Sequence, residues 1–146
     1  MPPRHRDIYT DDMFMVPRAP EPNPASMNYS VEVSTLVANM FADSGLDRFQ
    51  ITAEMSRLTG KEVSKYMLDG WTAESRDAYN MPFYMVPAAE AACQSHVMSA
   101  WLADKRGARL SIGREALNAE YGKLKAISDD VKKRIHALEK MLGTSA

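Results

Sequence analysis

The chain has 146 residues, of which 45% are hydrophobic and 25% are charged, and its 18 Lys and Arg against 19 Asp and Glu give a formal net charge of -1. These values are typical of a folded domain with a short extension, and they exclude a protein that coats nucleic acid by positive charge alone. The single Cys excludes an internal disulfide, there is no Cys/His cluster for a structural metal, and no apolar run approaches the ~18 residues of a membrane helix. We therefore expect a cytoplasmic protein with no cofactor and no membrane partner.

The balance of apolar residue types predicts an all-α fold. There are 19 Ala, 11 Met and 10 Leu against 8 Val and 5 Ile. Straight-chain residues and Ala favour helices, whereas β-branched residues favour strands. After residue 30 the sequence shows no sustained alternation of apolar and polar residues and no Asn-Gly or Asp-Gly hairpin signal. We therefore expect helices throughout the folded part of the chain.

Residues 1–28 are expected to form a flexible arm. Six of the eight prolines lie in the first 24 residues, and proline removes the backbone donors that helices and central strands need. An apolar cluster at residues 13–16 lies inside this Pro-rich arm. It either packs loosely on the parent domain or docks on a partner subunit, and both alternatives fit the pattern.

The segment 29–110 is expected to form one domain of five short helices. Gly60 follows the second helix and Gly107 the fifth, and both are typical stop signals. Apolar residues at helical spacing are expected to face the core, with Trp71 and Trp101 as its large anchors. The five expected helices cover residues 31–42, 49–58, 62–71, 82–94 and 96–106.

The second and third expected helices, with the turn between them, resemble a helix-turn-helix. In that motif a small residue lies where the helices cross, and Ala53 provides it; a β-branched core residue follows ten positions later, as Val63 does. Phe49 and Leu58 are expected to be buried beside Ala53. The motif usually has Gly four residues after the Ala, where this chain has Arg57. We therefore expect a longer or differently shaped turn.

The layout of residues 46–110 resembles the lambda-repressor-like DNA-binding domains, in which the helix-turn-helix occupies the second and third of five helices. Residues 84–110, with the elements Ala-Ala-Cys and Ala-Trp-Leu-Ala, are similar to the fourth and fifth helices of phage regulatory proteins of that type. The resemblance implies a phage-type transcriptional regulator that binds double-stranded DNA. We expect similar chains in Mu-like transposable phages.

The face of the third helix that points away from the core holds the candidate DNA-binding residues. Val63, Met67 and Trp71 are expected to point inward, and Leu68 outward. Lys and Ser side chains can bind phosphates or base edges, and Tyr can add a phosphate contact. The candidates are Lys61, Ser64, Lys65, Tyr66 and Thr72.

Acidic residues oppose this interpretation. Glu54, Glu62 and Asp69 would repel phosphate if they faced it, and residues 31–110 hold 8 Lys and Arg against 10 Asp and Glu. The alternative is that this helix face is simply solvated.

The strongest periodic signal lies in the C-terminal segment, residues 111–146. Its apolar residues recur at alternating steps of four and three, which predicts a coiled-coil-like helix whose apolar seam joins two copies into a homodimer. Ser111 is expected to cap this helix and Gly143 to end it. Two alternatives remain: the helix folds back over its own domain, or it breaks at residues 128–130 into a hairpin. The expected dimerisation residues are Leu117, Tyr121, Leu124, Val131, Ile135, Leu138 and Leu142.

Catalytic motifs are weak in this sequence. Cys93 precedes His96 by three residues, which on one helix would place a thiol beside an imidazole. However, Cys93 lies in an Ala-rich apolar stripe that is typical of a buried, unreactive thiol. We therefore expect that the protein is not an enzyme.

Two functions fit these observations. The first is a sequence-specific DNA-binding transcriptional regulator that acts as a dimer. The alternative is a phage-type adaptor or inhibitor that binds a host or phage protein through a helical, Met-rich surface. The near-neutral charge and the unusual turn at Arg57 favour this alternative, and the 11 Met are compatible with an adaptable binding surface.

Overall fold

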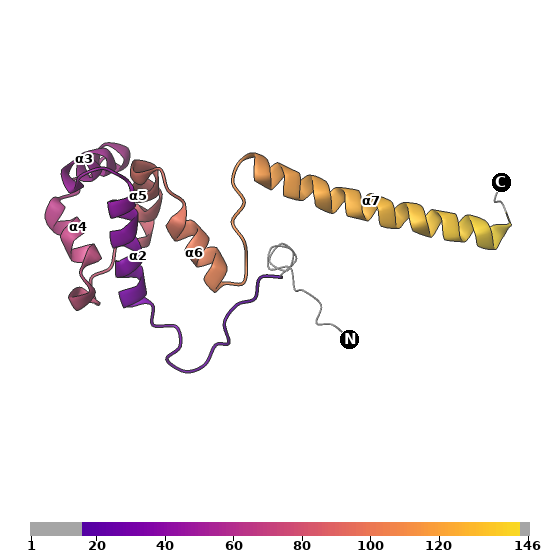
Figure 1. The fold of residues 1–146 in the computed structure, drawn as a ribbon, viewed down its shortest axis with the longest axis horizontal. Helices are drawn as coiled ribbons and strands as arrows, with labels where there is room; N and C mark the ends of the chain where they lie inside the picture. The colour runs from indigo at the N-terminus through magenta and orange to yellow at the C-terminus, as the bar shows by residue number, and fades with distance from the viewer. Residues whose placement is uncertain (1–15, 144–146) are drawn as a thin grey trace, which may run out of the picture. The chain divides into compact units, whose positions relative to one another are not determined.

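The computed structural model describes residues 16–143, and over this range it contains helices and no strand (Figure 1). The expectation of an all-α fold is confirmed. The chain divides into two compact units, residues 1–109 and residues 110–146. The second unit contains the long helix α7 (Arg114–Leu142). The elements of the first unit are α2 (Ser30–Asp43), α3 (Arg48–Thr59), α4 (Lys65–Thr72), the 3-10 turns η1 (Glu74–Arg76) and η2 (Phe83–Met85), α5 (Val86–Cys93) and α6 (Val97–Lys105).

Local capping fixes where α3 and α4 begin. The Asp47 carboxylate accepts a hydrogen bond from the Gln50 backbone N–H at 2.8 Å, and the Gln50 side chain accepts one from the Asp47 N–H at 2.9 Å. Gly60 ends α3 with a φ of 67°, a left-handed conformation that glycine adopts at low cost. Ser64 caps α4, so this helix begins at Lys65 rather than three residues earlier as expected.

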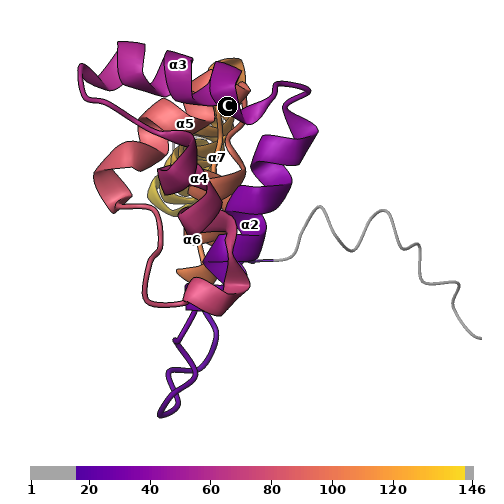
Figure 2. The same cartoon turned by 90° about the vertical axis from the view of Figure 1, so that its left-hand side faces the viewer.

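The core of the first unit lies between the five helices that the structure describes in it, α2 to α6. α3 packs against α5, and α2 packs against α4; in Figure 2, α3 runs across the top of this unit. Trp71 and Ile51 are among the largest fully buried side chains. Methionine contributes strongly to this core, because its flexible side chain fills irregular gaps. The buried methionines are Met40, Met55, Met81, Met85 and Met98.

The buried face of α3 differs from the expected one. Phe49, Ala53 and Leu58, which were expected in the core, are all exposed. The helix carries apolar residues on more than one face, so its periodicity does not fix its rotation, and packing against α5 decides it. The residues that α3 buries are Ile51, Thr52 and Met55.

The two tryptophans lie in different environments. Trp71 on α4 is 1% exposed, so its expected place in the core is confirmed. Trp101 on α6 is only partly buried, and its indole N–H donates to Oε1 of Glu32 at 2.8 Å. Its ring meets the ring of Tyr29 edge-on, with the centroids 5.4 Å apart. The prediction that Trp101 anchors the core is therefore wrong, because the indole lies at the rim, where its N–H finds a carboxylate.

The described part of the arm, residues 16–28, passes close to Gly107 near the end of the same unit. This glycine has a φ of 69°, and a Cβ atom there would overlap the backbone nitrogen of Ala19, so the position requires glycine for two reasons. Pro17 is partly buried, whereas the other residues of this stretch are exposed. The apolar cluster expected at residues 13–16 lies mostly outside the described residues.

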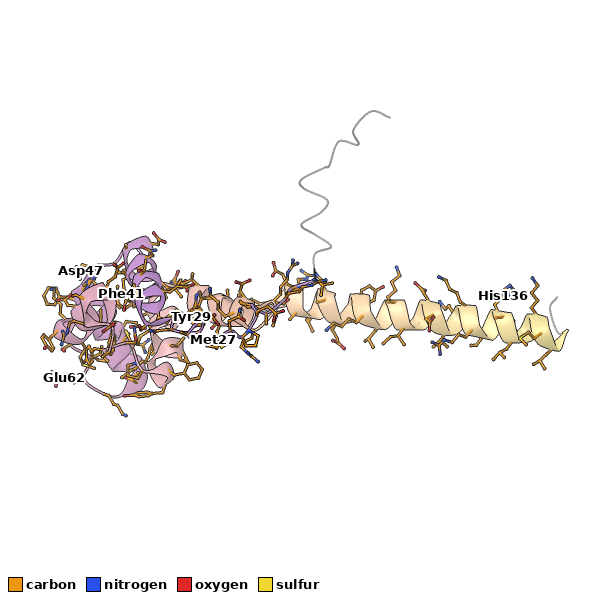
Figure 3. All side chains as sticks on the ribbon, turned by 90° about the horizontal axis from the view of Figure 1, so that it is seen from below. Met27, Tyr29, Phe41, Asp47, Glu62 and His136 are labelled. Carbon is orange, nitrogen blue, oxygen red and sulfur yellow. The ribbon has the colours of Figure 1, made fainter. Side chains whose placement is uncertain are left out.

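α7 is one uninterrupted helix of 29 residues. The alternative of a hairpin with a break at residues 128–130 is therefore wrong, and Asp130 instead pairs with Nε of Arg134 one turn later, at 2.8 Å. No side chain caps the start of the helix, so the expected cap at Ser111 is wrong, whereas Gly143 ends the helix as expected, with a φ of 68°. No residue of α7 is buried, and Figure 3 shows side chains standing out along its whole length.

Candidate nucleic-acid interface

One face of α4 is anchored in the core, and the opposite face is exposed. Val63 just before the helix, and Leu68 and Trp71 within it, are buried. The expectation that Leu68 points outward is wrong, because residues three apart in a helix share a face and Leu68 accompanies Trp71 inward. Lys65 and Tyr66 lie on the exposed side.

Ser56 ties together the turn between α3 and α4. Its Oγ accepts a hydrogen bond from the Val63 N–H at 2.9 Å and donates one to the Val63 carbonyl at 3.3 Å. Ser56, and not the exposed Ala53, therefore joins α3 to the residues just before α4.

Two of the candidate DNA-binding side chains are engaged by the fold. Oγ of Ser64 accepts from the Met67 backbone N–H at 3.2 Å as the N-cap of α4. Oγ1 of Thr72 accepts from Nη1 of Arg48 at 2.9 Å and donates to the Leu68 carbonyl at 3.0 Å. Both hydroxyls therefore position α4 instead of projecting from its exposed face.

A shared carboxylate neutralises part of the positive charge at α4. Asp69 accepts hydrogen bonds from Nζ of Lys65 at 2.8 Å and from Nη1 of Arg48 at 2.6 Å. These hydrogen bonds, the one from Lys65 first, hold the pKa of the Asp69 carboxyl below its usual value. The carboxylate is therefore charged at neutral pH and neutralises part of the charge of both basic side chains.

Two further basic side chains of the first unit lie beside aromatic rings. Nζ of Lys61 lies 5.0 Å from the centroid of the Tyr84 ring. The Arg76 guanidinium lies 5.2 Å from the ring centroid of Tyr66 and 5.0 Å from that of Tyr79, and it donates to the Tyr66 hydroxyl at 3.2 Å. Aromatic rings beside cations are a common means of binding nucleic acid. We call Lys61, Tyr66, Arg76, Tyr79 and Tyr84 the cation–aromatic surface.

Gly70 brings two residues to this surface that were not expected from the sequence. A Cβ atom on Gly70 would lie 2.5 Å from Cε1 of Tyr79 and 3.0 Å from Nη1 of Arg76. The missing side chain lets the segment after α4 pack back against the helix. A glycine inside a predicted helix was the one sequence signal of this close approach.

The structure separates Cys93 from His96. α5 ends at Cys93, Gln94 takes a left-handed φ of 50°, and His96 is exposed at the start of α6. Burial raises the pKa of the Cys93 thiol. Among residues 16–143, no group of three or more His, Cys, Asp or Glu residues is placed to hold a metal ion.

We expect the Cys93 thiol to react slowly in the folded protein. Only the thiolate is nucleophilic, and burial both raises the pKa and blocks the reagent, so labelling by Ellman's reagent at pH 8 should be at least about tenfold slower than in the urea-unfolded chain. His96→Ala should leave the folded rate unchanged. Equal rates for folded and unfolded chains, or a slower rate in the His96→Ala variant, would contradict this assignment.

All of the expected dimerisation residues lie on α7 and are exposed. The large apolar side chains of this helix are between 48% and 84% exposed. Ile127 and Met141 widen the apolar stripe and were not expected as part of it, because they lie one position before the seam. The expected seam residues are Leu117, Tyr121, Leu124, Val131, Ile135, Leu138 and Leu142.

Comparison with known proteins gives no match to this chain among family models, curated proteins or solved structures. Within residues 16–143, no helix combines the length and the apolar character needed to cross a membrane. The fold therefore defines an all-α protein with a compact helical unit and a separate long amphipathic helix.

Proposed function

We propose that the protein is a sequence-specific DNA-binding regulator of the phage type that acts as a homodimer. The observation that carries the proposal is the anchoring of α4 by buried Leu68 and Trp71, with Lys65 and Tyr66 on the opposite, exposed side. A capped helix held in this way against a bracing helix is the arrangement that helix-turn-helix proteins insert into the major groove. In this proposal α4 is the recognition helix and α3 braces it.

The residues assigned to DNA follow from their surroundings. Lys61 and Arg76 on the cation–aromatic surface are suited to phosphate contacts, and Tyr66, whose ring lies beside the Arg76 guanidinium, is exposed. Lys65 reaches a phosphate or a guanine edge once Asp69 releases it. Ser64 and Thr72 support the site by holding α4.

The first unit has a slightly negative net charge, so in this proposal tight DNA binding depends on dimerisation. Residues 31–110 hold 8 Lys and Arg against 10 Asp and Glu, so one unit alone should bind DNA weakly. An exposed seam on α7 offers the means to join two copies. Two linked units bind DNA more tightly than one, because after the first unit binds, the second is held near the DNA at a high effective concentration.

The pairing at Asp69 leads to a specific prediction. Asp69→Asn keeps the size of the side chain, removes a negative charge and releases Lys65 and Arg48 for phosphate. DNA affinity should therefore rise by about 1 kcal/mol, roughly fivefold. Lys61→Ala should weaken binding and lower the slope of affinity against salt by about one. Fluorescence anisotropy measures both, with a duplex that the parent chain selects from a random library, between about 50 and 200 mM salt.

A matched control separates local contacts from general charge. Lys133→Ala removes one positive charge from an exposed position in the other unit and should leave the affinity unchanged. If the Asp69→Asn and Lys61→Ala variants bind like the parent chain, the assignment of this surface to DNA fails.

A second candidate function is an adaptor or inhibitor that binds a host or phage protein. The Met-rich surface expected for it is wrong, since most of the described methionines are buried. An apolar groove of about 910 Å³ favours this function instead, and its volume is that of a typical ligand pocket. Aromatic residues from α6 and the segments preceding α2 and α5 line the groove: Tyr29, Phe83, Tyr84 and Trp101. A DNA-binding regulator should keep its DNA affinity after Phe83→Asp, whereas an adaptor should lose its protein partner.

A further inference from the structure

We infer that two copies of α7 pair in parallel and in register. This inference rests on the homodimer proposed above and adds the direction in which the two helices run. α7 is unbroken and exposed throughout, so its seam can be followed along the whole helix. One core row consists of Leu117, Leu124, Val131 and Leu138, and the other consists of Tyr121, Ser128, Ile135 and Leu142.

The residues beside these two rows carry the charges that decide the direction. In a coiled coil, the flanking positions face the partner helix, and their ion pairs set its orientation. The residues that precede the second row are Glu120, Ile127, Arg134 and Met141. The residues that follow the first row are Asn118, Lys125, Lys132 and Glu139.

A parallel pair in register gives these charges opposite partners. Each residue of the preceding set then faces the residue five positions later on the second copy. Glu120 faces Lys125 of the second copy, and Arg134 faces Glu139 of the second copy. Two-fold symmetry repeats both attractive contacts, and no charged residue of these sets faces a like charge.

An antiparallel pair brings like charges together. Full overlap places Leu117 opposite Leu142 and Leu124 opposite Ile135, and each flanking set then faces itself. Lys125 faces Lys132 of the second copy, again twice by symmetry, and both attractive contacts are lost. A parallel pair shifted by one heptad is also disfavoured, because it sets Arg134 against Lys132 in one direction and keeps only one attractive contact, Glu120 with Lys132, in the other.

The charged contact at Glu120 is the better one to test. Arg134 already pairs with Asp130 on its own helix, so its contribution to a dimer is divided between two carboxylates.

A parallel pair has a further consequence, since both chains then enter the coiled coil at the same end. Both first units attach at that end, as a regulator with two adjacent half-sites requires.

Lys125→Glu distinguishes the two directions by the sign of its effect. In the parallel pair it replaces an attractive contact with repulsion between Glu120 and the new carboxylate, so the dimer dissociation constant should rise at least about tenfold. In an antiparallel pair the new carboxylate would face Lys132, and the constant should fall. Sedimentation equilibrium of the full chain measures it. Mixing the Lys125→Glu and Glu120→Lys variants should restore tight pairing, because position 120 of each chain then faces an opposite charge at position 125 of the other.

Lys123→Glu is the control for this experiment. It makes the same charge change at an exposed position off the seam and should leave the dimer dissociation constant unchanged. An unchanged or tighter Lys125→Glu dimer overturns the parallel direction but retains self-association. A parent chain that remains a monomer up to about 100 µM overturns self-association as well, and with it the dimeric part of the proposed function.

Discussion

Leu124→Asp should convert the dimer into monomers. Leu124 lies in the middle of the apolar seam of α7 and is exposed in the single chain, so pairing has to cover it. A carboxylate at this position would have to be desolvated in both copies, which should cost roughly 4 kcal/mol per dimer, or about a thousandfold in the dissociation constant. Sedimentation equilibrium of the full chain measures the change.

Ala126→Asp is the matched control for this substitution. It introduces the same carboxylate into α7 two residues away, at an exposed position off the seam, and the dimer should persist. Far-UV circular dichroism of both variants should show the helix content of the parent. If the Leu124→Asp variant has the mass of the Ala126→Asp variant, the seam is not the interface.

Trp71→Ala should be among the most destabilising single truncations in the first unit. Trp71 is 1% exposed and is the largest fully buried side chain of the core. Its removal should lower the free energy of unfolding by about 3–5 kcal/mol. Urea unfolding followed by circular dichroism measures this loss without depending on tryptophan emission.

Trp101→Ala should cost clearly less, on the order of 1–2 kcal/mol, because it removes one edge contact with Tyr29 and one hydrogen bond to Glu32 at a partly exposed rim. Trp101→Phe keeps the ring and removes only the N–H donor, so it should lie closer to the parent. Equal losses for Trp71→Ala and Trp101→Ala would contradict the different placement of the two rings.

The positions of the helices could be predicted because local signals mark their ends. Gly60 and Gly143 take left-handed conformations that stop α3 and α7, and such stops depend on the residue and not on distant contacts. The start of α4 was predicted three residues early. An apolar pattern indicates where a helix can extend, whereas the cap at Ser64 decides where it begins.

The rotation of each helix depended on its neighbours and was harder to predict. α3 could bury either of two partly apolar faces, and packing against α5 buries Ile51 and Met55 instead of Phe49. Trp101 is apolar enough for a core, but Glu32 lies far away in the sequence and gives its N–H a partner at the surface. The periodicity of apolar residues does not predict such long-range contacts.

Only part of the candidate site could be predicted, because the rest depends on contacts between different elements. Lys61, Lys65 and Tyr66 are exposed as the pattern of α4 indicated. Arg76 and Tyr79 come from the segment after α4, and they reach this surface only because Gly70 leaves room for them. The spacing of residues within α4 cannot predict which residues of another segment pack against that helix.

The measurement that tests the proposed function most directly is the ratio of two affinities of the full chain at about 150 mM salt. One duplex is selected by the protein from a random library, and the other is a random duplex of the same length. We expect a preference of at least about a thousandfold, with two half-sites about one helical turn apart in the selected duplex. Equal affinities for the two duplexes would contradict the proposal that this protein is a sequence-specific DNA-binding regulator.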